Sequence, residues 1–446
     1  MKAMHRAGRS GLVIAVAAIV LAIGLGWLAP AHPVIVLAAA GMILALGIAS
    51  VDVSLIAVVA LPLLYVVARA AAGGVDLSVS DLALGAATVP ALIFATRPFS
   101  PPMRTLLWLT VVYQVATLFT VVANPYPANV IEWVHAWVLI AGALLVGWVV
   151  GREGHADLGL KLMLGAALIL ATWVIGTGAL AALAGDFRPV YLPFRMHKNF
   201  LGTVIGITAL IVYIRPAWLS IKPRIAMMIF WWLVIGLGFT QSRQAIVALG
   251  VALVVLVLRT RTDRRRSRAI LLAIIPALAV VLTLVRDQFA SDNQHNSVYQ
   301  RLTWFGDSLD IWSQQPIVGV GLRWWYTDRF AGAFQPPNAE IEVLTSAGLI
   351  GLAGFLVFMI GSVAVLWRVP PAYGMLALLA VLSRFVQGQM DLFWVAAQCS
   401  VPFAIAGICL GVWARHEDEG KSLAHLRAVD DSMAPLRSAP RIARSR

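Results

Sequence analysis

Apolar runs long enough to form membrane-spanning helices follow one another from Ser10 to Trp413. A helix crosses a hydrocarbon core of about 30 Å with ~20 apolar residues. The predicted spans lie at approximately residues 10–29, 33–50, 53–72, 82–96, 105–123, 129–150, 158–184, 199–214, 224–240, 244–258, 269–285, 340–367, 372–386 and 392–414. The sequence therefore predicts an all-α fold, a polytopic transmembrane helical bundle. Because several runs are short, the predicted number of helices is about 12–14.

The composition agrees with a chain that lies in lipid. Hydrophobic residues make up 60% of the 446 positions and charged residues only 12%, too few to cover a water-soluble core. No polar stretch between the apolar runs is long enough to fold as a separate soluble domain, so we expect residues 1–414 to form a single transmembrane domain. Residues 415–446 alternate charged residues with Ser, Ala and Pro and show no apolar period, which predicts a disordered cytoplasmic tail.

The basic residues predict the orientation of the bundle. The formal net charge is +13, and a strongly basic block extends from Arg259 to Arg268, between two predicted spans. Lys and Arg in short loops favour the cytoplasmic side of a membrane. We therefore expect this block and both termini to be cytoplasmic.

Two predicted extracytoplasmic segments are basic, against this charge rule. They are residues 185–198 and the long connection 286–338. A connection of more than about 15 residues is uncommon unless it has structure or a function. From Val298 to Trp312 its apolar residues recur at helical spacing, which indicates an amphipathic helix at the membrane interface. We expect this loop to carry short interfacial helices and to form a lid over an active site.

Several cations fall on the predicted extracytoplasmic side, where they need anionic partners. They are Arg188, Arg195, His197, Lys198, Arg243, Arg286, Arg301, Arg323 and Arg329. A guanidinium is permanently charged and binds phosphate oxygens through two N–H groups, so this set predicts a site for a phospholipid or lipid-pyrophosphate head group. The alternative is local pairing, for example of Asp391 with Arg384 or Arg243, or contact with lipid phosphate.

Several enzyme motifs are missing from the sequence. It contains no Walker loop, no H-E-x-x-H and no D-x-D pair on the predicted extracytoplasmic side. These gaps disfavour ATP-driven transport and nucleotide-sugar chemistry. We expect neither a metal nor another cofactor.

Four motifs in order resemble the O-antigen ligase and polymerase family of bacterial membrane glycosyltransferases. They are Thr240-Gln-Ser-Arg-Gln-Ala, Tyr299-Gln-Arg-Leu-Thr-Trp, Gln315-Pro-Ile-Val-Gly-Val-Gly and Asn338-Ala-Glu-Ile-Glu-Val-Leu-Thr-Ser-Ala-Gly-Leu-Ile-Gly. The resemblance extends over about residues 190–395. It implies transfer of a glycan from a polyprenyl-pyrophosphate carrier to a hydroxyl of an acceptor lipid or glycan, on the outer side of the bacterial cytoplasmic (inner) membrane.

The resemblance also implies roles for particular residues. By motif position, the family's donor-binding arginines correspond to Arg243 and, in a less direct match, to Arg195 and Arg301, with Lys198 beside them. A pyrophosphate leaving group needs charge neutralisation, which fixed cations can supply without a metal. The accessory candidates are Arg188, His197, Asn199, His295, Asn338 and Asp391.

The last motif departs from the family at one position. The family motif usually begins with His-Asn, and that histidine is the proposed base, whereas this chain has Pro337-Asn338. Proline cannot accept a proton. Of the candidate replacements Glu340, His197 and His295, we favour Glu340, because it starts the same predicted helix.

The sequence thus favours a metal-independent, inverting glycosyltransferase of the ligase or polymerase type, and does not separate the two. Two alternatives stay open. A transporter or flippase for a lipid-linked or anionic solute would use the same cations for binding alone. An inactive scaffold of a polysaccharide assembly complex would account for Pro337.

Overall fold

The computed structural model describes residues 33–437 apart from 73–74, 195, 260–296, 328, 331, 333 and 396. The first elements are α2 (Pro33–Val51), α3 (Val53–Leu63), β1 (Arg69–Ala72), β2 (Val75–Ser78), α4 (Val79–Phe94), α5 (Pro101–Ala123), α6 (Pro127–Trp137), the π-helix η1 (Val138–Gly142), α7 (Ala143–Arg152) and α8 (Ala156–Leu183). Then come α9 (Lys198–Ile214), α10 (Pro223–Thr240), α11 (Arg243–Arg259), α13 (Ser297–Trp312), the 3₁₀ turn η2 (Trp324–Tyr326), α14 (Ala339–Arg368), α15 (Pro371–Gly388) and α16 (Ser400–Arg437).

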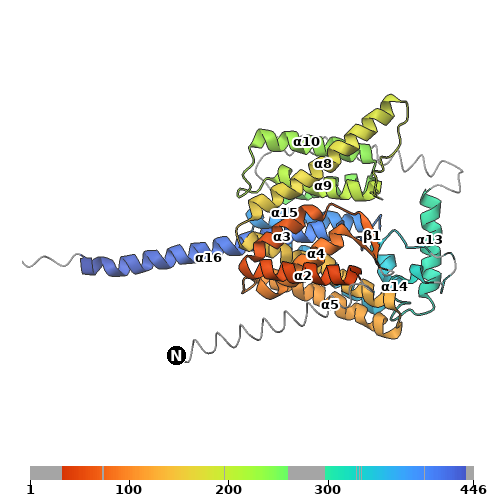
Figure 1. Ribbon diagram of the computed structural model, residues 1–446, viewed down its shortest axis with the longest axis horizontal. Helices are drawn as coiled ribbons and strands as arrows, with labels where there is room; N and C mark the ends of the chain where they lie inside the picture. Colours follow the sequence, from red (N-terminus) through yellow and green to blue (C-terminus); the bar gives the residue numbers. More distant parts are fainter. Residues whose placement is uncertain are drawn as a thin grey trace, which may run out of the picture.

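The helices run alongside one another in a bundle with two distinct ends (Figure 1). α13 lies across one end, which we call the α13 end, and α16 extends away from the other, which we call the α16 end. α13 covers the stretch 298–312 where the sequence predicts an amphipathic helix, so the helix is confirmed, while its place at a membrane interface stays a prediction.

Among the described residues, five helical segments are long and apolar enough to cross a membrane. They are Pro101–Ala123, Pro127–Arg152, Ala156–Leu183, Pro223–Thr240 and Ala339–Arg368. Shorter apolar helices, α3, α4 and α9 among them, accompany these spans. The predicted all-α polytopic bundle is confirmed, while the spans predicted at 10–29 and 269–285 lie outside the described residues.

The span predicted over 53–72 is wrong in its second half. α3 ends at Leu63, and β1 pairs antiparallel with β2, with Arg69 opposite Ser78. Pro62 lies in the last turn of α3, and proline has no N–H with which to continue a helical hydrogen-bond ladder. This hairpin is the only strand pairing named among the described elements, which are otherwise helical.

Glycines bring α7 and α16 into backbone contact. A Cβ on Gly147 or Gly151 of α7 would overlap backbone atoms of α16, and one on Gly407 or Gly411 of α16 would overlap those of α7. Small residues four positions apart let membrane helices approach closely where apolar burial supplies little attraction. The four glycines thus allow α7 and α16 to pack backbone against backbone.

α14 is divided by a break at Gly348, where the backbone has φ 65° and ψ −166°. Glycine adopts positive φ without the clash that a Cβ would cause. The break divides α14 into two unequal parts. We call the shorter first part, residues 339–347, the leading half of α14, and the longer part behind it is apolar. The candidate base Glu340 therefore belongs to a short helix of about two turns, which begins at Ala339, two residues after Pro337.

Residues 316–327, which we call the crossing segment, run past this break. The amide of Val320 donates to the carbonyl of Thr345 (3.1 Å), and the amide of Gly321 donates to the carbonyl of Ser346 (2.9 Å). Broken helices inside a membrane need such partners because no water is there to satisfy the backbone. The crossing segment thus stabilises the break and holds the leading half of α14 in place.

The region predicted as a disordered tail, 415–446, differs in the structure, because α16 continues to Arg437. Arg415 Nε donates to Glu419 Oε1 one turn further on (2.8 Å), and Arg152 of α7 pairs with Asp418. Ion pairs at this spacing stabilise a helix where no apolar face does. The described part of the tail is therefore a helical extension of the last span.

Candidate functional site

Polar residues from three parts of the chain meet at Asp391, in the connection between α15 and α16. Its carboxylate is buried, with 8% of the residue exposed. Asn199 Nδ2 donates to Oδ1 (3.1 Å) and Gln244 Nε2 donates to Oδ2 (2.8 Å). Asn199 is the second residue of α9 and Gln244 the second residue of α11. Asp391 therefore ties the starts of two helices to the α15–α16 connection.

Cations stand directly beside these two amides. Lys198 begins α9 and Arg243 begins α11, so the contacts with Asp391 carry both cations to the same place. The positive charges of Arg243 and Arg301 act on Lys198, and that of Arg301 acts on Arg243. Arg301 comes from α13, which lies across this end of the bundle.

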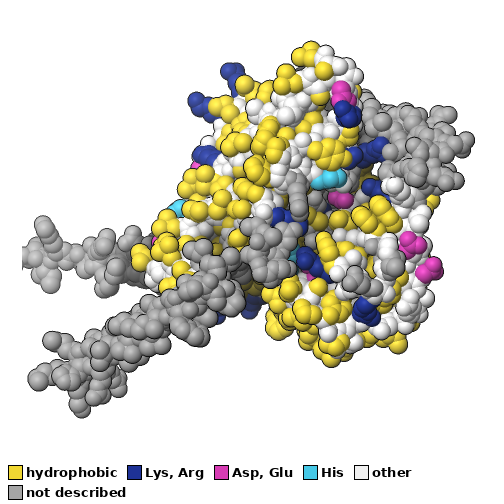
Figure 2. Space-filling view, turned by 45° about the vertical axis from the view of Figure 1, so that its right-hand side comes forward, with side chains coloured by type: hydrophobic (Ala, Val, Ile, Leu, Met, Phe, Trp, Pro, Cys, Tyr) yellow, Lys and Arg dark blue, Asp and Glu magenta, His cyan; other side chains and the backbone are white. Residues whose placement is uncertain are grey.

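Three of the four predicted donor-binding residues thus gather at the α13 end. Figure 2 shows Lys or Arg, His and acidic side chains together in a hollow of the molecule, beside hydrophobic surface. Like charges repel, so a cluster of cations with one buried carboxylate favours an anion. The fourth donor-binding candidate, Arg195, lies outside the described residues, as does the candidate base His295.

His197 is the N-cap residue of α9 and borders this cluster. Its Nδ1 accepts a hydrogen bond from the amide of Asn199 (3.2 Å), and its ring meets that of Tyr191 edge to face. Burial lowers the pKa of His197, the Lys198 charge lowers it further, and Asp391 opposes both. In the neutral ring the proton then sits on Nε2, because Nδ1 is the acceptor. This tautomer caps a helix and leaves no free lone pair for a base.

Glu340 and Asn338 reach the same connection from the leading half of α14. Asn338 caps the helix by accepting from the amide of Ile341 (2.9 Å), and its Nδ2 donates to the carbonyl of Gln389 (3.2 Å). Gln389 Nε2 donates to Glu340 Oε1 (2.7 Å). The other Glu340 oxygen, Oε2, is buried and has no hydrogen-bond partner among the described residues. Gln389 precedes Asp391 by two positions, so Glu340 contacts the connection that carries Asp391.

A second carboxylate in this half-helix was not among the predicted site residues. Glu342 is only 2% exposed, and Gln335 Nε2 donates to its Oε1 (3.0 Å). The charge of Glu132 of α6, another helix of the bundle, acts on Glu342. The Glu-Ile-Glu sequence indicates two carboxylates at the helix start, but their different burial depends on tertiary packing.

Arg188 has a local partner outside this cluster. Its Nε donates to both oxygens of Asp186 (2.6 and 2.8 Å), and its side chain is 81% exposed. The guanidinium lowers the pKa of the Asp186 carboxyl. For this residue, local pairing explains the charge.

Arg384 shapes the connection that carries Asp391. It is completely buried, and its guanidinium donates to the carbonyls of Leu392 and Phe393 and to Gln398 Oε1 (3.2 Å). It also lies over the Phe393 ring, 4.8 Å from its centroid. The Arg384–Asp391 pair considered from sequence is therefore replaced by contacts with carbonyls of the connection, although the Arg384 charge still acts on Asp391.

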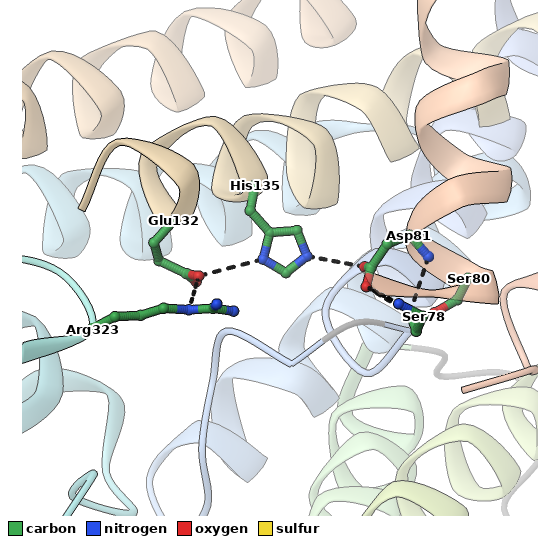
Figure 3. Close-up of polar contacts among 6 residues, drawn as sticks. All are labelled: Ser78, Ser80, Asp81, Glu132, His135 and Arg323. Carbon is green, nitrogen blue, oxygen red and sulfur yellow. Dashed lines mark hydrogen bonds and ion pairs between the residues drawn. The ribbon is translucent and has the colours of Figure 1, made fainter. Parts of the chain in front are cut away.

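A second polar network lies between α4, α6 and the crossing segment (Figure 3). His135 Nε2 contacts Asp81 Oδ1 (3.0 Å), and His135 Nδ1 lies 3.6 Å from Glu132 Oε2. Arg323 of the crossing segment pairs with Glu132. Asp81 in turn accepts from the hydroxyl of Ser78 (2.6 Å), with which it forms a capping box. No sequence pattern indicates the Asp81–His135 contact, which joins residues 54 positions apart.

Comparison with protein families gives one match. A family model described as O-antigen ligase matches residues 228–356, from α10 into α14. The matched region contains Arg243, Arg301, the crossing segment and Glu340, but not Lys198 or Asp391. No curated protein matches the chain. With its apolar spans, the chain is a multi-pass membrane protein that processes glycans.

Proposed function

We propose that this chain, which belongs to the O-antigen ligase family, transfers a glycan from a polyprenyl-pyrophosphate donor to a hydroxyl of an acceptor lipid or glycan. The observation that carries the proposal is the gathering of Lys198, Arg243 and Arg301 from three helices around one buried carboxylate. Transfer takes place on the outer side of the inner membrane, with the α13 end facing outward. The enzyme is of the ligase or polymerase type.

The cations bind the donor pyrophosphate and stabilise it as a leaving group. During transfer, the acceptor oxygen forms a bond to the anomeric carbon while the bond from that carbon to the pyrophosphate oxygen breaks. Negative charge grows on the departing pyrophosphate, so fixed cations stabilise the transition state more than the ground state. In-line displacement inverts the anomeric centre. In this proposal Arg243 is the main contact of the donor pyrophosphate, and the transfer requires no metal.

Glu340 takes the proton from the acceptor hydroxyl. Its Oε1 is held by Gln389, which orients the carboxylate, while Oε2 has no hydrogen-bond partner among the described residues. A general base must lie within hydrogen-bond reach of the proton that it takes, and Gln389 ties Glu340 to the connection that carries Asp391. The carboxylate replaces the histidine that Pro337 excludes. His197 is a poorer base because its Nδ1 accepts the helix-capping bond.

The test is Arg243→Ala in an assay with purified protein in nanodiscs, a polyprenyl-pyrophosphate glycan and an acceptor glycan or lipid. We expect transfer to fall at least ~100-fold, because a fixed charge at the leaving group is lost. Arg415→Ala, which removes an arginine at the α16 end, is the matched control and should retain activity. Unchanged turnover of the Arg243 variant would sink the assignment.

The same assay separates the enzyme from a transporter. A transporter would bind the donor but form no new glycosidic bond, so mass spectrometry of the products decides between the two. Analysis of lipid-linked glycans in a deletion strain then separates the two enzyme types. Long chains left on the carrier indicate a ligase, and single repeat units indicate a polymerase.

A further inference from the structure

The leading half of α14 is too short to hold its own position. Residues 339–347 form about two turns, and an isolated helix of that length is unstable in water. The break at Gly348 removes the support of the longer helix behind it. The place of Glu340 relative to the cation cluster therefore depends on what holds the crossing segment, which supplies partners for Thr345 and Ser346.

The crossing segment is attached to α5 and α6 by polar contacts at its middle. Asn124 Nδ2 donates to the carbonyl of Gly319 (3.0 Å), and Asn129 Oδ1 accepts from the amide of Leu322 (2.9 Å). The hydroxyl of Tyr126 donates to the Leu322 carbonyl. These bonds fix the backbone, and they all come from neutral groups.

Arg323 adds a charged contact at the next position. Its backbone is left-handed (φ 54°, ψ 30°), a conformation that is unfavourable for a residue with a Cβ. The side chain pairs with Glu132, whose carboxylate also faces His135, and His135 contacts Asp81 at the start of α4 (Figure 3). The network connects the crossing segment to two helices of the bundle. The crossing segment lies inside the region that the family model matches, whereas Asp81, Glu132 and His135 lie outside it.

We infer that Arg323, through Glu132, is a positioning residue for transfer, because it holds the crossing segment against α6 and so sets the place of the leading half of α14. The inference rests on the proposed function. It gives the Asp81–His135–Glu132–Arg323 network a role in turnover, in addition to any role in stability. The network touches neither the donor cations nor Glu340 among the contacts of the described residues. It acts on the leading half of α14 through the crossing segment, and the charge of Glu132 also acts on Glu342 there.

The test compares Arg323→Gln, Glu132→Gln and the double variant with wild type. We expect kcat to fall about 10–100-fold in each, because a small displacement of a catalytic group is enough for such a loss. The KM for the donor should stay within about twofold, since Lys198, Arg243 and Arg301 are anchored elsewhere. The double variant should equal the single variants, because both remove the same contact. Arg323→Lys should restore part of kcat, and Arg415→Gln is the control.

The fall in kcat at unchanged donor KM is the readout that a merely structural role would not move, and hydrogen exchange shows which segments lose their support. In Arg323→Gln, peptides that cover 316–327 and 339–347 should exchange faster while α7 and α16 exchange as in wild type. Loss of activity that follows loss of folded protein, with wild-type kcat per folded molecule, would overturn the inference. Equal kcat and exchange in wild type and variant would overturn it too. An Arg243→Ala variant that still transfers contradicts the proposed function, whereas a dead Arg243→Ala with a fully active Arg323→Gln contradicts this inference alone.

Discussion

At the residue scale, α9 and α11 begin in the same way, with a cation followed by an amide. Lys198 precedes Asn199, and Arg243 precedes Gln244. Both amides donate to Asp391, so one buried carboxylate holds the starts of two helices together, and with them two cations. The arrangement thus brings positive charge from two helices to one place, which favours an anion there.

His197 predicts how the stability of the folded protein depends on pH. Burial, assisted by Lys198, lowers its pKa in the folded state below the value of about 6.5 found in unfolded chains. The unfolded state therefore binds more protons between these two pKa values, so the free energy of unfolding falls as the pH drops below about 6.5. In His197→Gln this part of the pH dependence should disappear. Unfolding in detergent from pH 8 to pH 5 measures it.

The control for this prediction is His416→Gln, which changes a histidine at the α16 end. It leaves the α9 cap intact. The loss of unfolding free energy below about pH 6.5 that His197 causes should therefore persist in this variant. A His197→Gln profile that runs parallel to wild type over the whole range would contradict the assignment.

At the element scale, the sequence predicts the apolar helices well and the breaks in them poorly. The span predicted at 105–123 corresponds to α5, and the amphipathic stretch 298–312 corresponds to α13, because apolar content and helical spacing are local properties. The break at Gly348 lies against the backbone of Ile317, about 30 residues earlier, and no local pattern records that contact. The Asp81–His135 pair was missed for the same reason.

The candidate site divides along the same line. Arg243 and Arg301 could be predicted because each lies in a short motif, and because positive charge is unusual on the predicted outer side. Their grouping with Lys198 around Asp391 could not, because Asp391 meets Asn199 across 192 positions of the chain. Sequence thus indicates the residue types of the site, while their arrangement depends on how α9, α11 and the α15–α16 connection pack.

The break in α14 gives a prediction about a single glycine. Gly348→Ala places a Cβ against the carbonyl of Ile317 at a residue with φ 65°. Backbone strain and overlap together should cost about 2–5 kcal/mol of unfolding free energy. Thermal unfolding of the purified protein measures the loss. Gly165→Ala, in the middle of α8 where a Cβ meets nothing within 4 Å, should leave stability equal or up to about 1 kcal/mol higher. Equal effects of the two substitutions on the unfolding free energy would contradict a break that requires glycine at position 348.

At the scale of the whole molecule, the two ends of the bundle differ in chemistry. The α13 end carries the cation cluster, the broken helix and the crossing segment, whereas the α16 end carries the helical extension with its surface ion pairs. The close contact of α7 with α16 runs between them. Because that contact is rigid and the leading half of α14 is held by a loop, motion needed to admit two large substrates belongs at the α13 end.

The proposed orientation predicts which end reagents can reach from outside the cell. Arginines in short loops favour the cytoplasm, and the basic block at 259–268 predicts that the α16 end is inside and the α13 end outside. The exposed residues Asp310 of α13 and Glu417 of α16 are suitable for single cysteine substitutions, since the natural Cys399 and Cys409 are buried. A membrane-impermeant maleimide added to spheroplasts should label Asp310→Cys strongly and Glu417→Cys only after the membrane is opened. The reverse pattern would place the cation cluster in the cytoplasm, where the proposed transfer from an outward-facing lipid-linked glycan cannot occur.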